Sequence, residues 1–180
     1  MSISRQQRQA VFLDRDGVLN ETIVRDGKPY PPVTVAQIQI PQGTATALLR
    51  LKEHEFVLPV VTNQPDVARG TQVREKVEEI DRYLQNQLPL DEFFVCYHDD
   101  VDNCSCRKPR PGLVLRAAEQ YGIDLSRSFL VGDRWRDIEA GASAGCTTIW
   151  IDRGYAEKSP TPDARVHSLP EAVDWILKKP

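Results

Sequence analysis

Four aspartates stand at or soon after the ends of two apolar runs in the chain. Asp14 and Asp16 lie in DRDG, and Asp133 and Asp137 lie in GDRWRD. Carboxylates that meet at one place supply the hard oxygen ligands that Mg²⁺ prefers. One carboxylate can attack phosphorus and form an aspartyl-phosphate, while a neighbour gives a proton to the leaving oxygen and later takes one from water. The aspartates therefore predict magnesium-assisted phosphoryl transfer.

Other residues in the chain offer groups that suit an anion. Thr62 and Asn63, in TNQ, follow the apolar run at 56–61. Lys108 lies in the segment after the apolar run at 93–98. Hydroxyl, amide and ammonium groups are good donors to phosphate. At an effective dielectric of about 20, two unit charges about 4 Å apart repel by roughly 4 kcal/mol, and a carboxylate facing a phosphate dianion meets about twice that. We expect Mg²⁺ and Lys108 to offset this repulsion.

The stretch VCYHDDVDNCSCRKP holds three of the four cysteines and one of the three histidines. Cys96 and His98 are two residues apart, as are Cys104 and Cys106, so each pair can present both side chains on one face of an extended segment. Three sulfurs and one nitrogen form a closed tetrahedral set that suits structural Zn²⁺, with no open position for a catalytic water. The alternative is that these are ordinary buried cysteines, which is how we interpret Cys146.

The predicted zinc has a structural task. It would hold the zinc-binding loop, residues 96–106, in place. That loop leads directly to Arg107 and Lys108, so we expect the zinc to fix how both basic side chains reach the phosphate.

Short apolar runs alternate with longer amphipathic segments. Strands are predicted at 10–13, 56–61, 93–98, 128–132 and 147–151, and helices at 43–54, 72–88, 111–121, 135–144 and after the capping-box pattern of Ser168 and Glu171. Gly145 can end the helix at 135–144, and Pro59 is disfavoured inside a central strand. The pattern predicts an α/β fold with a doubly wound, Rossmann-like parallel sheet. The carboxyl ends of such strands line one crevice, which brings the polar residues together.

Length and composition limit the remaining possibilities. With 180 residues we expect one domain, residues 1–180. The net charge of −3 does not indicate a nucleic-acid partner. The N-terminal segment has no apolar core typical of a signal peptide, and no apolar run could cross a bilayer. We therefore expect a cytoplasmic protein with reduced thiols, no membrane partner and a monomeric state. Residues 20–36 and 152–167 are predicted to be loops.

Four motifs in this order resemble those of the haloacid dehalogenase (HAD) superfamily of phosphohydrolases. They are VFLDRDGVLN, VVTNQ, RKPRPG and LVGDRWRDIEAG, and they extend from about residue 10 to 151. The resemblance implies that Asp14 is the nucleophile and Asp16 the acid and base, and that Thr62 and Lys108 hold the phosphoryl group.

The same resemblance implies a set of magnesium ligands. These are the carboxylates of Asp14 and Asp133 and the backbone carbonyl of Asp16, with Asp137 supporting the metal through water.

A narrower resemblance is to the branch acting on D-glycero-D-manno-heptose 1,7-bisphosphate, with the histidinol-phosphate phosphatases as the alternative. FLDRDGVLN, the Cys/His loop and CRKP carry it. It implies a small phosphorylated metabolite, a sugar bisphosphate, as substrate, and it implies that Arg107 joins Lys108 in contacting it. Pro65 and Asp66 stand where that branch usually has serine and glycine.

The segments between the motifs are too short for a separate cap domain. We expect a capless, open site shaped by loops 20–36, 64–71 and 97–108. Basic side chains should make it locally positive for a substrate with more than one anionic group: Arg69, Arg107, Lys108, Arg110 and Arg134.

Two other classes of protein remain open. A phospho-receiver signalling domain also clusters acids, a threonine and a Lys-Pro pair at strand ends, but it takes phosphate on a middle strand and does not carry DxDG on the first. A zinc interaction module would use the cysteine loop as its working surface, and it predicts that Asp14→Asn leaves function intact.

Overall fold

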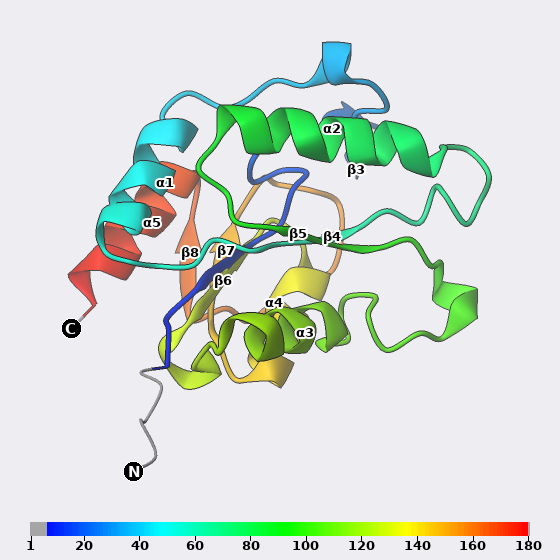
Figure 1. Cartoon of the computed structure of the whole chain (residues 1–180). Coiled ribbons are helices and arrows are strands. Elements are labelled where there is room, and N and C mark those ends of the chain that lie inside the picture. Colours follow the sequence, from blue (N-terminus) through cyan, green and yellow to red (C-terminus); the bar gives the residue numbers. More distant parts are fainter. Residues whose placement is uncertain (1–6, 180) are drawn as a thin grey trace.

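The computed structural model describes residues 7–179 and is built around a six-stranded sheet (Figure 1). All paired neighbours in the sheet are parallel, and their order is β5 (Phe93–Cys96), β4 (Val60–Asn63), β1 (Val11–Leu13), β6 (Phe129–Gly132), β7 (Thr147–Ile151) and β8 (Ala164–Val166). The chain leaves the central β1 toward β4 and β5, then returns to its other side for β6. This reversal of strand order confirms the doubly wound α/β fold.

The ends of the predicted domain, residues 1–6 and 180, lie outside the described residues. The N-terminal segment, in which we predict no signal peptide, begins among residues 1–6. In the described part, no helix has the length and apolar character needed to cross a membrane.

Five α-helices of the described residues cover the two faces of the sheet (Figure 1). The first face packs against α1 (Thr44–Glu53), α2 (Arg74–Gln87) and α5 (Leu169–Lys178). The second face packs against α3 (Gly112–Tyr121) and α4 (Trp135–Ala144). Apolar side chains of α1, α2 and α5 share one buried cluster, and those of α3 share the other.

The central strand is buried on both faces. Val11 and Leu13 belong to the cluster under α1, α2 and α5, while Ala10 and Phe12 belong to the cluster under α3. This is the alternation expected of a strand, in which successive side chains point to opposite faces. Because β1 is held so firmly, Asp14, the next residue, has a fixed position at the carboxyl end of the sheet.

The strand predicted at 56–61 starts later than expected. It begins at Val60 and continues to Asn63, with an isolated bridge from Val57 to Ala10 before it. Pro59 lies between the two and has no N–H to donate to the ladder, although its carbonyl accepts from Leu13 N at 3.0 Å. The strand predicted at 93–98 ends at Cys96.

The two segments predicted as loops contain strands. Within 20–36, β2 (Ile23–Arg25) and β3 (Lys28–Tyr30) form an antiparallel hairpin. Its turn residues, Asp26 and Gly27, have φ angles of 50° and 71°, the left-handed conformation for which Asp-Gly is favoured in hairpins. Within 152–167, β8 adds an edge strand. The loop prediction was wrong at both places.

The helix boundaries agree closely with those predicted from the sequence. Gly145 follows α4 with a φ angle of 89°, a conformation for which glycine pays no steric cost, and the Ser168 hydroxyl caps α5 by accepting from Glu171 N. Between β1 and β4 the described chain forms the hairpin, a 3-10 turn (Val35–Gln37) and α1, with no further domain. The predicted capless arrangement is therefore confirmed.

Candidate active site and metal centre

A pocket of about 420 Å³ opens at the carboxyl ends of the central strands. Asp14 follows β1, Thr62 lies near the end of β4 and Asp133 follows β6, and all three line this pocket. The fold thus brings together residues that are up to 119 positions apart, 133 minus 14.

The ammonium group of Lys108 lies at the bottom of the pocket. Its Nζ is 2.8 Å from Asp14 Oδ1 and 2.6 Å from Asp137 Oδ1, and it also donates to Val61 O at 2.7 Å. Burial disfavours the charged amine, but attraction to Asp137 and Asp14 outweighs this and raises the pKa of Lys108. The lysine therefore stays charged and acts as a fixed counter-ion between two carboxylates.

Asn63 holds the backbone of Lys108 from the neighbouring strand. Its Nδ2 donates to Lys108 O at 3.0 Å, and its Oδ1 accepts from Lys108 N at 3.1 Å. The paired bonds suit an amide, which offers one donor and one acceptor side. Asn63 lines the pocket, and its amide positions the lysine there.

Three carboxylates, which we call the acid cluster, meet beside the lysine: Asp14, Asp133 and Asp137, each with an oxygen within 4.8 Å of the others. All three are buried, and among the described residues the two oxygens of Asp133 have no hydrogen-bond partner. Burial, with repulsion from Asp14 and Asp137, raises the pKa of Asp133 well above its usual range. Burial and Asp137 also raise the pKa of Asp14 to about 7, although Lys108 opposes the shift.

Buried carboxylate oxygens without a partner are costly, and a divalent cation would satisfy them. The oxygen donors of the acid cluster fit Mg²⁺, which takes carboxylate ligands and retains several waters. Glycine allows the close approach: a Cβ at Gly17 would lie 1.8 Å from Asp133 Oδ2, and one at Gly132 would lie 2.1 Å from the Asp137 Cβ. The residues present therefore fit the predicted magnesium site.

The carboxylate of Asp16 also lines the pocket but has different partners. Asn20 Nδ2 donates to its Oδ1 at 3.0 Å, and Gln64 Nε2 donates to its Oδ2 at 2.8 Å. Gln64 Nε2 also lies 3.0 Å from Thr62 Oγ1. A further donor is the side chain of Arg15. Asp16 is thus fixed by uncharged and cationic donors, whereas the acid cluster is held by Lys108.

Three of the predicted arginines, Arg69, Arg107 and Arg134, line the rim of the pocket, each with a carboxylate partner. Arg69 Nε lies 2.6 Å from Asp99 Oδ2, and Arg134 Nε donates to Glu157 Oε1 at 2.7 Å. These pairings reduce the positive charge that either guanidinium presents to a ligand. Arg69 is also largely exposed to solvent.

Arg107 is the most enclosed of these arginines, with 8% of its surface exposed. Its Nε donates to Asp100 Oδ1 at 2.8 Å, and Arg136 contacts the same oxygen at 3.0 Å. Arg136 lines the pocket and was not singled out from the sequence. Arg110 was expected to contribute charge at the mouth, but it donates to Cys104 O and Asn103 Oδ1 within the zinc-binding loop.

The far wall of the pocket was not predicted. It consists of the β2–β3 hairpin and the segment 155–157, which is linked to it. Ala156 N donates to Gly27 O at 3.0 Å, and the hydroxyls of Tyr155 and Thr22 are 2.9 Å apart. Lys28 lines the pocket from this wall. The Asp-Gly dipeptide signals the hairpin, but no sequence signal indicates that 155–157 lies against it.

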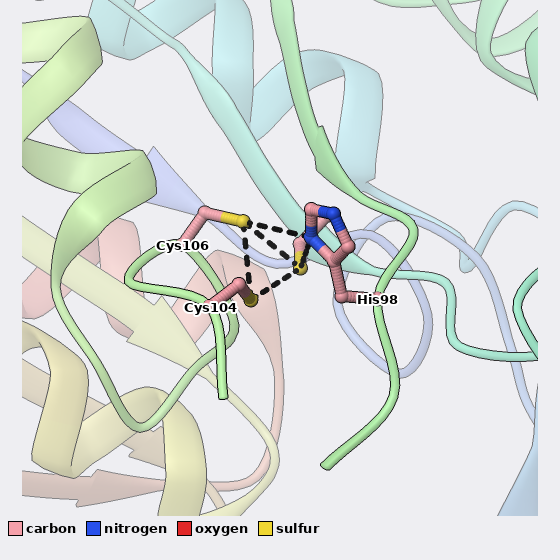
Figure 2. A group of neighbouring side chains, drawn as sticks. His98, Cys104 and Cys106 are labelled. Atoms are coloured by element: carbon pink, nitrogen blue, oxygen red, sulfur yellow. Dashed lines mark hydrogen bonds between the residues drawn. The ribbon is translucent and has the colours of Figure 1, made fainter. Parts of the chain in front are cut away.

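The second group of candidate ligands is the sulfur cluster, which consists of Cys96, His98, Cys104 and Cys106. Figure 2 shows the side chains of His98, Cys104 and Cys106 pointing toward one another. The Sγ atom of Cys96 lies 3.7 Å from that of Cys104 and 3.2 Å from that of Cys106. His98 Nδ1 lies 3.4 Å from Cys106 Sγ.

These spacings fit a single ion. Sulfurs about 2.3 Å from a tetrahedral zinc lie roughly 3.8 Å apart. Burial and a hydrogen bond with Cys106 raise the pKa of the Cys96 thiol. Burial alone would also raise the pKa of Cys104, but the Arg107 N–H and the neighbouring thiols lower it to about 7. The Arg107 N–H donates to Cys104 Sγ at 3.3 Å, so the cluster is bonded directly to the segment that carries Arg107 and Lys108.

Known proteins are similar in sequence to this chain over most of its length. A phosphatase from Helicobacter pylori (strain J99), named D-glycero-beta-D-manno-heptose-1,7-bisphosphate 7-phosphatase, is 32% identical over 176 residues, which cover 93% of this chain and 97% of that protein. The enzyme of the same name from Escherichia coli (strain K12) is 32% identical over 180 residues, covering 93% and 87%. The HAD-hydrolase-like family model matches residues 105–176.

This chain belongs to the HAD hydrolases. The predictions of the HAD family and of a phosphatase are thereby confirmed.

A solved structure supports the same assignment. The HAD phosphatase from B. bronchiseptica, described as a D,D-heptose 1,7-bisphosphate phosphatase complexed with magnesium and phosphate, superposes with a TM-score of 0.80 at 28% sequence identity. The match covers 94% of this chain and 98% of that one. The match thus spans nearly the full length of both chains.

Proposed function

We propose that this chain is a Mg²⁺-dependent phosphatase that removes the 7-phosphate of D-glycero-D-manno-heptose 1,7-bisphosphate. The observation that carries the reaction type is the contact of Lys108 Nζ with Asp14 and Asp137 at the bottom of the pocket. A carboxylate nucleophile needs such a counter-ion before it can approach a phosphate dianion. The identity of the sugar is inferred from the names of the relatives described above.

In the proposed reaction, an oxygen of Asp14 attacks phosphorus and forms an acyl phosphate. The bond from phosphorus to the sugar oxygen breaks, and Asp16 gives that oxygen its proton. Asp16 then takes a proton from the water that hydrolyses the acyl phosphate. Thr62 and Lys108 hold the phosphoryl group during both steps.

Magnesium would be held by the carboxylates of Asp14 and Asp133 and by the backbone carbonyl of Asp16, with Asp137 supporting it through water. When bound, it neutralises the charge that the phosphoryl group brings into a buried acidic site. The unpartnered oxygens of Asp133 support this assignment.

The proposed zinc is held by the sulfur cluster and has a structural role. Its ligands are Cys96, His98, Cys104 and Cys106, a closed set for a tetrahedral ion. By fixing the 96–106 loop it positions Arg107 and Lys108. Thiol ligands of this kind fit the reducing cytoplasm, where we propose that the protein acts.

We also propose that residues 1–180 act as one domain and one monomer. The second phosphate of the substrate would lie toward the rim, near Arg107. Arg69 and Arg134 also line this rim, and each pairs with a carboxylate, as Arg107 does.

A substrate screen tests the proposal. The purified protein with Mg²⁺ is given heptose 1,7-bisphosphate, sugar monophosphates, histidinol phosphate and nucleotides, and released phosphate is measured. We expect the highest kcat/KM for the bisphosphate, with loss of one phosphate, and no turnover after Mg²⁺ is removed. A higher kcat/KM for histidinol phosphate would favour the alternative substrate. Stoichiometric phosphorylation without turnover would indicate a receiver domain.

A further inference from the structure

A buried ion pair lies beside Asp16. Arg15 has none of its surface exposed. Its Nη2 donates to Asp16 Oδ2 at 2.9 Å, and its Nε lies 3.2 Å from both Asp16 oxygens. The opposite side of the guanidinium donates through Nη1 to Asp81 Oδ1 at 2.8 Å. One arginine thus joins the carboxylate at the pocket to a carboxylate on α2.

Asp81 is an unusual residue at its position on α2. It lies on the buried face of the helix, together with Val77, Ile80 and Leu84. A carboxylate among apolar side chains is unfavourable unless it is paired and hydrogen-bonded. Burial raises the pKa of Asp81, and attraction to Arg15 opposes that shift. A leucine at this position would serve packing alone, so the aspartate needs another explanation.

Arg15 is equally constrained at its own backbone. Its carbonyl accepts from Leu19 N at 2.8 Å and from Asn20 N at 3.3 Å, which closes the turn after β1. Because the backbone is fixed by this turn and the guanidinium by Asp81, the side chain has little freedom to reorient. A group that binds the Arg15 guanidinium is therefore held in a fixed position.

What Arg15 holds is Asp16, whose side chain keeps 14% of its surface exposed toward the pocket. Asn20 and Gln64 complete the donors around its two oxygens. We propose that Arg15 and Asp81 are positioning residues, which fix the Asp16 carboxyl in the orientation from which it protonates the leaving oxygen. This inference rests on the proposed phosphatase reaction, and nothing in that reaction requires Asp81 itself.

Leaving-group dependence separates a positioning role from a structural one. As Asp14 forms its bond to phosphorus, the bond to the leaving oxygen breaks and the Asp16 proton moves to that oxygen. An alkoxide leaving group needs this proton, whereas p-nitrophenolate is stable without it. The ratio kcat/KM reports only the steps up to departure of the leaving group, so later hydrolysis of the acyl phosphate does not obscure the comparison.

The experiment uses Asp81→Asn and measures kcat/KM for a sugar or other alkyl phosphate and for p-nitrophenyl phosphate. General acid catalysis typically contributes about 10²–10⁴-fold. Imperfect placement of the acid should therefore reduce kcat/KM about tenfold or more for the alkyl ester and less than about threefold for the aryl ester. Glu78→Gln is the matched control, since Glu78 lies on the same helix in an exposed pair with Arg74, and we expect it to change neither value.

A double variant, Arg15→Met/Asp81→Leu, guards against misfolding of Asp81→Asn. Replacing a buried ion pair by apolar residues is often neutral or stabilising, so this protein should fold while Asp16 loses its support. The same selective loss on the alkyl ester is expected. A ratio of the two kcat/KM values that stays unchanged, or that changes in the opposite sense, overturns the proposal. Failure of the unmodified protein to hydrolyse either ester contradicts the proposed function instead.

Discussion

The acid cluster and the sulfur cluster both gather potential metal ligands, but different parts of the fold hold them. The acid cluster stands at the ends of β1 and β6 and at the start of α4, where packing on both faces of the sheet fixes the backbone. It also contains its own counter-ion, Lys108.

The sulfur cluster lies within eleven residues, from Cys96 at the end of β5 into the connecting segment that follows, and His98 is exposed. Burial raises the pKa of the Cys96 thiol, which keeps it from ionising readily. The contrast leads us to expect that the sheet builds the first site before any metal binds, whereas the proposed zinc orders the second. The following predictions test that difference.

The largest effect is expected from Asp14→Asn. Removing the nucleophile should reduce kcat by about 10³-fold or more, since no covalent intermediate can form in the proposed way. The protein should still fold and retain its zinc, because the amide occupies the same volume and removes a repulsive charge. Steady-state kinetics, a thermal melt and elemental analysis measure the three quantities. Near-normal turnover would contradict the mechanism.

The next effect should follow loss of the sulfur cluster. Cys104→Ser/Cys106→Ser should contain no zinc and melt about 5 °C or more below the unmodified protein, because metal binding contributes folding free energy. Its kcat/KM should fall about tenfold as Arg107 and Lys108 lose their fixed position. Mg²⁺ should still raise its melting temperature through the acid cluster.

Cys146→Ala is the control for this double variant, since Cys146 is a buried cysteine that does not belong to the sulfur cluster. It should keep one zinc per chain after dialysis. If the unmodified protein, purified without added metal, contains no zinc, the contrast between the two clusters fails.

A smaller effect is expected at the rim. Arg107→Ala should raise KM for the bisphosphate about five- to tenfold and for p-nitrophenyl phosphate by less than about twofold, because only the first ligand has a second anionic group for a charge-assisted bond. Arg165→Ala, on the edge strand β8, removes an arginine outside the pocket and should change neither KM. Equal increases for both substrates would place Arg107 outside substrate recognition.

The smallest effect concerns pH and stability. The raised pKa of Asp14, about 7, means that the folded state binds more protons than the unfolded state between about pH 4 and 7. Without Mg²⁺, the melting temperature should therefore fall by a few degrees as pH rises through this window. Saturating Mg²⁺ should remove the fall, and Asp14→Asn should reduce it. An identical pH dependence in wild type and variant contradicts the assignment.

The acid cluster was predictable because it follows from a rule of topology. Apolar runs identify buried strands, and residues after such runs in a parallel sheet share one edge. Asp14 and Asp133 needed no further information. The sulfur cluster was predictable for a different reason, since the spacing from Cys96 to Cys106 is local.

The remaining contacts could not be read from the sequence because they join side chains far apart in the chain. Arg15 and Asp81 are separated by 66 residues, and the heptad-like spacing of α2 suggests an apolar residue at 81. Arg134 pairs with Glu157 from a segment without a regular pattern. The charge of a rim arginine can be counted in the sequence, but its partner is known only once loops are placed.

The β2–β3 hairpin forms one wall of the pocket while standing outside the six-stranded sheet. Its links to the segment 155–157 include one backbone hydrogen bond and one hydroxyl contact. Insertions or exchanges in this ribbon can therefore accumulate without disturbing the packing that aligns Asp14. Evolution can therefore change the pocket wall that selects the substrate while the residues that carry out the reaction are kept. Substrate selectivity and reaction chemistry can then diverge at different rates within one small enzyme.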